Sequence, residues 1–208
     1  TFDLGVGVLD GGWTRTLENG RVRLGGRLQM VTLDGERFQE GYGLVGSYDR
    51  SLDRNWMLSL SGSATALRFD NDAGRDVDQF LGSATLVRPA GQFVHTFTLY
   101  AAFETAQSAR GDFNGRDFAG LLYGLTYDMG VAQPFLRLGA QQAEFDDTHP
   151  VFGRVRDDTT LTAAAGLQWT IAEDFLVTGQ ANYTDVDSNL PVFEFDRALF
   201  ELGLRRNF

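Results

Sequence analysis

The sequence predicts an all-β fold, an antiparallel transmembrane β-barrel. Apolar residues alternate with polar or small ones in segments of about ten residues, which is the pattern of a strand that crosses a membrane. Glycine is frequent (25 residues), proline is rare (4) and phenylalanine is abundant (17), a composition that favours many strands joined by tight turns. No apolar run approaches the roughly 20 residues that a membrane-spanning helix needs. A membrane protein of this kind has to be a barrel.

About eleven strands follow from the alternation. The first is expected at residues 2–13, with Phe2, Leu4, Val6 and Val8 in one phase before Gly11 and Gly12 disturb it. The apolar phases of the next nine strands are marked, in chain order, by Val22, Leu24, Leu28 and Met30; Tyr42, Leu44 and Tyr48; Trp56, Leu58, Leu60, Ala64 and Ala66; Phe80, Ala84 and Leu86; Phe93, Phe97, Leu99, Ala101 and Phe103; Ala119, Leu121, Tyr123, Leu125 and Tyr127; Leu136, Leu138 and Ala140; Leu161, Ala163, Ala165, Leu167 and Trp169; Phe175, Val177, Ala181 and Tyr183. The last strand is expected at residues 195–208, where Ala198, Phe200, Leu202, Leu204 and Phe208 share one phase.

The opposite phase of these strands is small or polar. It carries serine and threonine at Ser59, Ser61, Ser63 and Thr65, for example. Such a face suits a wet lumen, but it also suits the solvent face of a soluble sandwich, so the alternation alone does not separate the two folds.

Two further features favour the membrane barrel. Short connections, such as residues 51–54, 89–91, 128–131 and 171–173, interleave with longer polar ones at 69–76, 106–116, 146–158 and 185–194. Outer-membrane barrels have short periplasmic turns and longer outer loops. With the last residue placed in the periplasm, Trp13, Trp56 and Trp169 all fall at the periplasmic rim, as expected of an interfacial aromatic girdle.

The strand count has a consequence for the whole chain. We expect residues 1–208 to form one outer-membrane β-barrel domain. If residues 2–13 are one strand, that strand runs inward, whereas a complete single-chain barrel has an even number of strands and both ends in the periplasm. The expectation is then that an upstream segment is missing. The alternative is that Gly11 and Gly12 form a hairpin turn, which would give a complete barrel of about twelve strands.

Composition excludes several function classes. The formal charge of −10 argues against a nucleic-acid surface. There is no cysteine, so thiol chemistry, cysteine-based zinc sites and disulfides are excluded, and all 18 basic residues are arginine, which excludes a P-loop lysine or a Schiff base. We expect no cofactor and no enzymatic activity.

The end of the chain resembles known barrels. A closing strand that ends on an aromatic residue, here Phe208, is similar to the C-terminal strand of bacterial outer-membrane barrels, in which it is the recurring assembly signal. Arg206 departs from that pattern, although an arginine at the membrane edge can snorkel. The resemblance implies the barrel assembly machinery as a partner, with outer-membrane lipid and lipopolysaccharide as surroundings.

The last residues resemble, more narrowly, the end of the surface lipoprotein assembly modifier family. The matching positions are Ser188, Asn189, Pro191, Phe193, Phe195, Asp196, Arg197, Leu202, Gly203, Leu204, Arg205 and Phe208. The resemblance implies a barrel of about fourteen strands, a periplasmic domain of helical repeats, and a role in bringing client lipoproteins to the cell surface. This chain contains no helical repeat pattern, so that domain would lie outside it.

Two outer loops carry candidate chemistry. Asp70, Asp72, Asp76 and Asp78 have a spacing that is similar to calcium loops, although the glutamate that completes an EF-hand is absent; a solvated hairpin loop is the simpler interpretation. Asp146, Asp147 and His149 would suit a surface hydrolase in which a carboxylate orients a general base.

Charged residues on the polar phase are candidates for transport or client contact. They are Arg21, Arg23, Arg27, Arg137, Arg197, Arg205 and Glu201. Such arginines can attract anions or dock a client. The alternative is that they pair with Asp49, Glu104 and Glu201 and stiffen the interior, since unpaired charge in a narrow interior is costly.

Together these observations predict an outer-membrane barrel that assists the translocation or surface display of a client (lipo)protein. A porin-like channel for small solutes is the alternative. A surface enzyme that uses His149 is a third interpretation.

Overall fold

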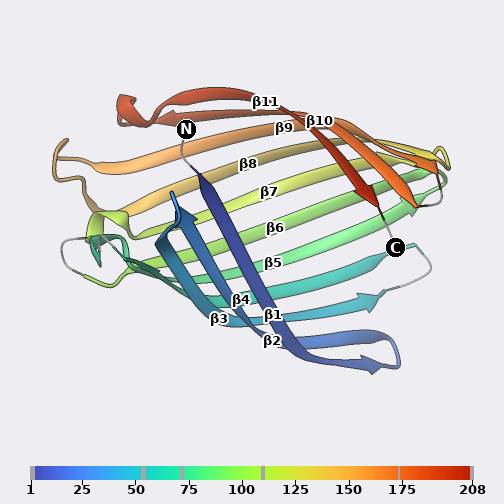
Figure 1. The fold of residues 1–208 in the computed structure, drawn as a ribbon, viewed down its shortest axis with the longest axis horizontal. Coiled ribbons are helices and arrows are strands. Elements are labelled where there is room, and N and C mark those ends of the chain that lie inside the picture. The colour runs from blue at the N-terminus through green and yellow to red at the C-terminus, as the bar shows by residue number, and fades with distance from the viewer. Residues whose placement is uncertain (1–2, 53–54, 71–72, 109–110, 173, 207–208) are drawn as a thin grey trace.

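The computed structural model describes residues 3–52, 55–70, 73–108, 111–172 and 174–206. Eleven antiparallel strands form one sheet in which every strand pairs with its neighbours in sequence (Figure 1). Their bounds are β1 Leu4–Leu17, β2 Gly20–Leu33, β3 Glu36–Ser51, β4 Met57–Phe69, β5 Val77–Ala90, β6 Phe93–Ala106, β7 Arg116–Tyr127, β8 Ala132–Thr148, β9 Val155–Ala172, β10 Phe175–Ser188 and β11 Phe195–Arg206. Three short 3₁₀ turns lie between strands: η1 Ala73–Arg75, η2 Asp112–Asn114 and η3 Pro191–Phe193. The predicted all-β fold and its strand number are confirmed.

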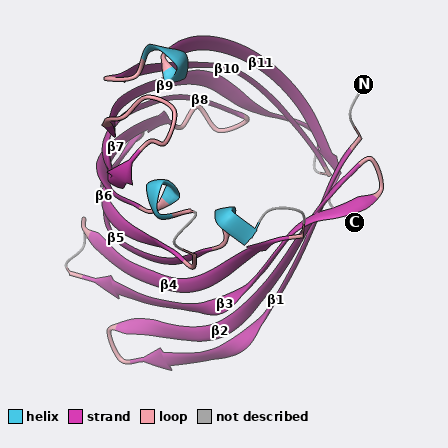
Figure 2. Cartoon of the chain, turned by 90° about the vertical axis from the view of Figure 1, so that its left-hand side faces the viewer, coloured by secondary structure: helices cyan, strands magenta, loops and turns pink. Residues whose placement is uncertain are grey.

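The sheet curls around a central lumen, with its two ends distinguished by their connections (Figures 1 and 2). One end, the short-turn end, holds the connections of β1 to β2, β3 to β4, β5 to β6, β7 to β8 and β9 to β10. The other, the long-loop end, holds η1, η2, η3 and the 149–154 connection, together with the tight Asp34–Gly35 turn. The alternation of connection lengths predicted from the sequence is therefore present, with the β2 to β3 turn as the exception.

The two faces of the sheet differ as predicted. Directly paired residues in an antiparallel ladder lie on the same face, so the register traces each face across the strands. One face carries large exposed apolar side chains, including Leu24, Leu44, Phe80, Leu99, Leu121, Leu161, Phe200 and Leu202. The other carries serine, threonine, glutamine and charged side chains together with the buried residues of the molecule, and it is the inner face.

The first strand differs from its prediction in two ways. It continues through Gly11 and Gly12, which pair with Gly26 and Gly25, so the hairpin turn considered for these glycines is wrong. Leu4, Val6 and Val8 lie on the same face of β1 as Asp10. Asp10 is directly opposite Arg27, which is on the inner face of β2. The apolar residues at the start of β1 therefore face the lumen, because the pairing of β1 with β2 continues without a shift through Gly11 and Gly12.

β1 and β11 are the edges of the sheet. Within the described residues they pair only with β2 and β10, respectively, and they run in the same direction because an odd number of antiparallel strands connects them. Apolar side chains on both edges are highly exposed, among them Leu9 and Leu202.

The tryptophans all lie towards the short-turn end, as predicted. Trp13 is near the end of β1, Trp56 immediately precedes β4, and Trp169 is near the end of β9. Trp13 and Trp169 are half-exposed on the outer face, which suits side chains that sit at a membrane interface.

Candidate functional site

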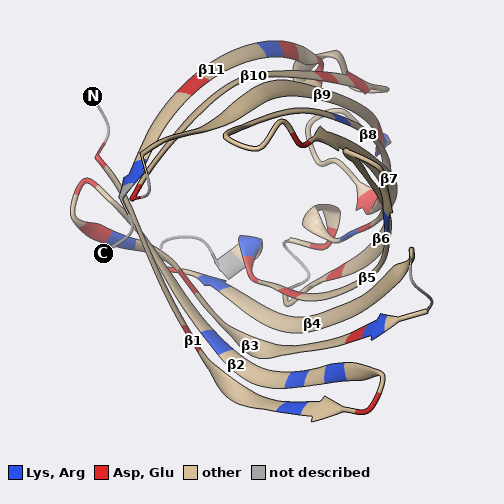
Figure 3. Cartoon of the chain, turned by 90° about the vertical axis from the view of Figure 1, so that its right-hand side faces the viewer, with Lys and Arg blue, Asp and Glu red and all other residues tan. Residues whose placement is uncertain are grey.

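The inner face of β2 and β3 holds a pair of arginines on one carboxylate. Arg21 and Arg23 donate to the same Asp49 oxygen, at 3.1 and 3.2 Å. Arg21 is directly opposite Asp49 in the ladder, so the register itself brings them together. Ser59 on β4 donates to the other carboxylate oxygen at 2.7 Å. Two guanidinium groups share one carboxylate, which leaves this part of the inner wall with an excess of positive charge. Figure 3 marks the arginine positions along the strands in blue and the acidic positions in red.

Arg27 pairs with Asp10 on the adjacent strand. Its Nε lies 2.7 Å from Asp10 Oδ1, and a second donor reaches Oδ2 at 3.1 Å, a two-point contact between directly opposed residues. The prediction that acidic residues neutralise the inner arginines therefore holds here, but Asp10 was not among the predicted partners.

The predicted partners Glu104 and Glu201 contact other residues. Glu104 accepts from Arg116 at 2.6 Å and from Gln79. Glu201 accepts from Gln180 and, at 3.0 Å, from Asn182, both on β10. Glu104 and Glu201 thus bind Arg116 and side-chain amides instead of the arginines for which they were expected as partners.

The remaining predicted arginines are spread around the inner face. Arg137 lies over the Phe135 ring, 4.8 Å from its centre. Arg197 and Arg205 on β11 are opposite Thr184 and Leu176. The seven predicted charged residues therefore share the inner face but do not gather into one cluster.

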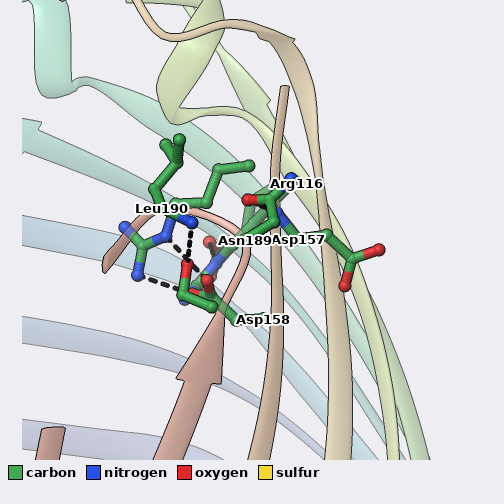
Figure 4. A network of polar contacts seen from close by, with 8 residues as sticks. Arg116, Asp157, Asp158, Asn189 and Leu190 are labelled. Carbon is green, nitrogen blue, oxygen red and sulfur yellow. Dashed lines mark hydrogen bonds and ion pairs between the residues drawn. The ribbon is translucent and has the colours of Figure 1, made fainter. Parts of the chain in front are cut away.

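The C-terminal motif residues anchor a loop at the long-loop end (Figure 4). Asn189 donates to the Val155 carbonyl at 2.8 Å and accepts from the Asp157 amide at 3.0 Å, and Ser188 accepts from the Leu190 amide at 3.2 Å. Pro191 then opens η3. Asp196 follows the first residue of β11 and lies on the outer face, opposite Asp185, whereas Phe208 lies outside the described residues.

The acidic loop residues are held by separate partners. Asp70 accepts from Arg37 at 2.6 Å, Asp78 accepts from Arg68 at 2.7 Å, and Asp76 accepts from the Phe69 amide at 2.8 Å. Asp72 lies outside the described residues. Among the residues that the structure describes, no three His, Cys, Asp or Glu side chains are grouped so that they could hold a metal ion.

The predicted hydrolase residues do not share one loop. Asp146 and Asp147 belong to β8, because that strand extends to Thr148. His149 begins the connection, where its Nδ1 accepts from the Val151 amide at 3.3 Å and its ring contacts the rings of Phe113, Phe152 and Phe193. The expected loop location is therefore wrong for the two aspartates, and His149 lies in an aromatic environment.

The ion pair of Arg156 with the buried Asp158 at this end was not predicted from the sequence. Arg156 pairs with Asp158 at 2.9 Å, and its guanidinium lies 3.6 Å from the centre of the Phe193 ring and 4.6 Å from that of Phe145. A signal was present, since Arg156 and Asp158 continue the phase of Thr160 and Thr162 into the strand. They were assigned to the loop because they are charged.

A recess of about 560 Å³ follows the inner wall of β1 to β5. Arg23, Arg27 and the hydroxyls of Ser47, Ser61 and Ser63 contribute to its lining.

In the part of the chain that the structure describes, no helix is long and apolar enough to cross a membrane.

Comparisons with known proteins support the fold. No protein-family model matches the sequence, and comparison with curated proteins finds no match. Among solved structures, the chain is similar to "Copper transporter OprC", with a TM-score of 0.53 and 11% identity over 98% of this chain. It is also similar to the NanC porin, with a TM-score of 0.51 and 10% identity over 97% of this chain.

The extent of these matches differs. The chain spans 40% of the length of the copper transporter and 99% of that of the porin. At such low identity the likeness concerns the fold alone. The chain has the β-barrel fold of outer-membrane proteins, which confirms the predicted fold and, with it, the predicted location in the bacterial outer membrane.

Proposed function

We propose that this chain is the membrane barrel of a protein that assists a client (lipo)protein to cross the outer membrane or to reach its surface. The observation that carries the proposal is the C-terminal segment. Its family-like residues Ser188, Asn189 and Pro191 form one ordered unit, in which Asn189 fixes the start of η3 to β9 through both ends of its side chain.

The edge strands of the described sheet also support this proposal, because β1 and β11 do not pair with each other there. Backbone N–H and C=O groups that lack a partner are costly in lipid, so an exposed edge favours the addition of another extended segment. Within the described residues β1 and β11 offer two such edges. An unfolded client segment that passes along the barrel is a partner of this kind.

The same proposal includes the surroundings predicted from the sequence. The outer apolar face contacts outer-membrane lipid and lipopolysaccharide, and the closing strand engages the barrel assembly machinery. A periplasmic helical-repeat domain would deliver the client.

The test is the surface display of a client lipoprotein in a strain that lacks this protein. Display is measured by protease accessibility on intact cells, with complementation by the wild-type chain and by Asn189→Ala. We expect the client to stay protected from protease in the deletion strain and to be displayed only in part with Asn189→Ala. Val192→Ala, on the same loop but exposed, is the matched control. Normal display in the deletion strain contradicts the proposal.

A channel for small solutes is the second candidate, favoured by the recess with Arg23, Arg27 and serine hydroxyls on the inner wall. A wet face of this kind can conduct ions. Stable conductance of the purified protein in planar bilayers would support it. The absence of conductance would contradict it, provided that it is also absent in the Gly111→Val and His149→Ser variants, which alter the connections at the long-loop end.

A further inference from the structure

Buried residues of this molecule gather at one end of the lumen. With the exception of Phe135, the buried side chains of the described strands lie on the inner face at the long-loop end, and the buried Leu190 lies in the loop beside them. They are Val77, Ala102, Glu104, Ala143, Phe145, Asp158, Val186 and Ser188. An inner face that met only water would leave such residues exposed, so other parts of the chain cover them.

The covering segments are the connections that fold inward over the lumen (Figure 2). We name them the loop cap, which consists of residues 73–75, 111–115, 149–154 and 189–194. η2 packs against β6 and β8, and it also contacts η1. The connections that hold η1 and η2 therefore meet inside the ring of strands.

Two of these connections interlock through their backbones. Asn114 Nδ2 donates to the Gly74 carbonyl at 2.9 Å. Gly111 lies so close to the same carbonyl that a Cβ atom at position 111 would collide with it. Only glycine allows this approach, and it brings η1 and η2 into direct contact.

His149 joins the other two connections to η2. The centre of its ring lies 5.3 Å from that of Phe113 in η2, 4.9 Å from that of Phe152 and 5.6 Å from that of Phe193 in η3. Such distances are those of packed aromatic pairs, each of which adds to the burial of apolar area. Arg156 then stacks on Phe193 and Phe145, so the cluster is continuous with the inner wall of the barrel.

The cap does not leave buried polar groups unsatisfied. Among the described residues, every buried side-chain nitrogen or oxygen atom has a hydrogen-bond partner. The connections pack through apolar contacts, and their buried polar groups are hydrogen-bonded, as in the interior of a folded protein.

We propose that the loop cap closes the lumen at the long-loop end, so that the lumen is a vestibule open from the short-turn end. Passage of a solute or a client segment through the barrel then requires the cap to move. The contacts of Gly111 and His149 are the ones that hold it shut. This inference does not depend on which of the two functions the barrel performs.

The first test measures conductance of the full-length protein in planar bilayers. Gly111→Val and His149→Ser each break one set of cap contacts, and His149→Phe keeps the aromatic packing as the matched control. We expect conductance to rise several-fold in the first two variants and to stay at the wild-type value in the third. Equal conductance in all four proteins would overturn the proposal if all four are folded, as judged by their electrophoretic mobility before and after heating.

The second test does not rely on conductance. The chain has no cysteine, so single cysteines report on one position only. Ala143→Cys lies beneath the cap, and Ser61→Cys lies on the exposed inner wall. With a water-soluble maleimide we expect Ala143→Cys to react at least about ten-fold more slowly than Ser61→Cys, since the cap has to open first.

Introducing His149→Ser should speed the reaction of Ala143→Cys and leave that of Ser61→Cys unchanged. If the rate at position 143 does not respond to His149→Ser or to Gly111→Val, the cap does not cover the lumen and the proposal is wrong.

Discussion

The Arg156 guanidinium lies 3.6 Å from the centre of the Phe193 ring and at the same time pairs with the carboxylate of Asp158, whose side chain is 7% exposed. One side chain therefore ties η3 to the wall of β9 through two different interactions. A cation on an aromatic face and a buried ion pair both gain strength where water is excluded.

Arg156→Ala is expected to destabilise the long-loop end. Breaking a buried pair leaves Asp158 charged and unpartnered, which costs about 3 to 5 kcal/mol. The measurement is urea unfolding in lipid vesicles, followed by tryptophan fluorescence. Arg156→Lys keeps the charge but loses the planar contact, so it should fall between the wild type and Arg156→Ala. An unchanged unfolding midpoint for Arg156→Ala would show that this contact contributes nothing.

Gly12→Ala is expected to weaken the pairing of β1 with β2. A Cβ at position 12 would lie 2.5 Å from the Leu24 carbonyl oxygen and 2.8 Å from the Gly25 Cα. Overpacking of this kind typically lowers the free energy of unfolding by about 1 to 3 kcal/mol. Gly11→Ala is the matched control, since nothing lies within 4 Å of the corresponding Cβ. Equal stability of the two variants in the same unfolding measurement would refute the close approach of the strands.

Much of this architecture could be predicted from the sequence, because the period-two pattern of β4, β9, β10 and β11 is set by the contrast between lipid and water. The phase of β1 could not be assigned, since Leu4 and Val8 are apolar but face inward, near the long-loop end. The end of β8 was misplaced because Asp146 and Asp147 are polar residues that continue a strand beyond the apolar region.

The candidate site was predicted less completely than the fold. The sequence indicates that Arg21, Arg23 and Arg27 share one face, because their spacing is even. It does not indicate that two of them share Asp49, which depends on the register between β2 and β3. The loop cap was not predicted, because contacts such as those of His149 with Phe113 and Phe193 join connections that are far apart in the chain.

Phe200→Arg is expected to impair membrane insertion, because Phe200 is 80% exposed on the outer face near the middle of β11. An arginine on the lipid face near the bilayer midplane costs about 2 to 4 kcal/mol. The neighbouring Leu199→Arg places the same charge on the inner face and should insert well. Folded yield in lipid vesicles compares the two, and equal yields would contradict the assignment of the faces.

Arg23→Glu is expected to reduce the anion preference of any conductance, because Arg21 and Arg23 give this wall its excess positive charge. The measurement is the reversal potential in a salt gradient, recorded in the His149→Ser background in which the cap is expected to be open. Arg15→Glu, which changes the same charge on the outer face, is the control. An unchanged reversal potential for Arg23→Glu would place the ion path elsewhere.

The most direct measurement is a cysteine scan along β11 of the cysteine-free chain, from residue 197 to residue 204, in lipid vesicles. Each cysteine carries a polarity-sensitive fluorescent label. We expect the emission spectrum of a label in an apolar environment at residues 198, 200, 202 and 204, and that of a label in water at residues 197, 199, 201 and 203. Emission that does not alternate would contradict a barrel with lipid on one face and a wet lumen on the other.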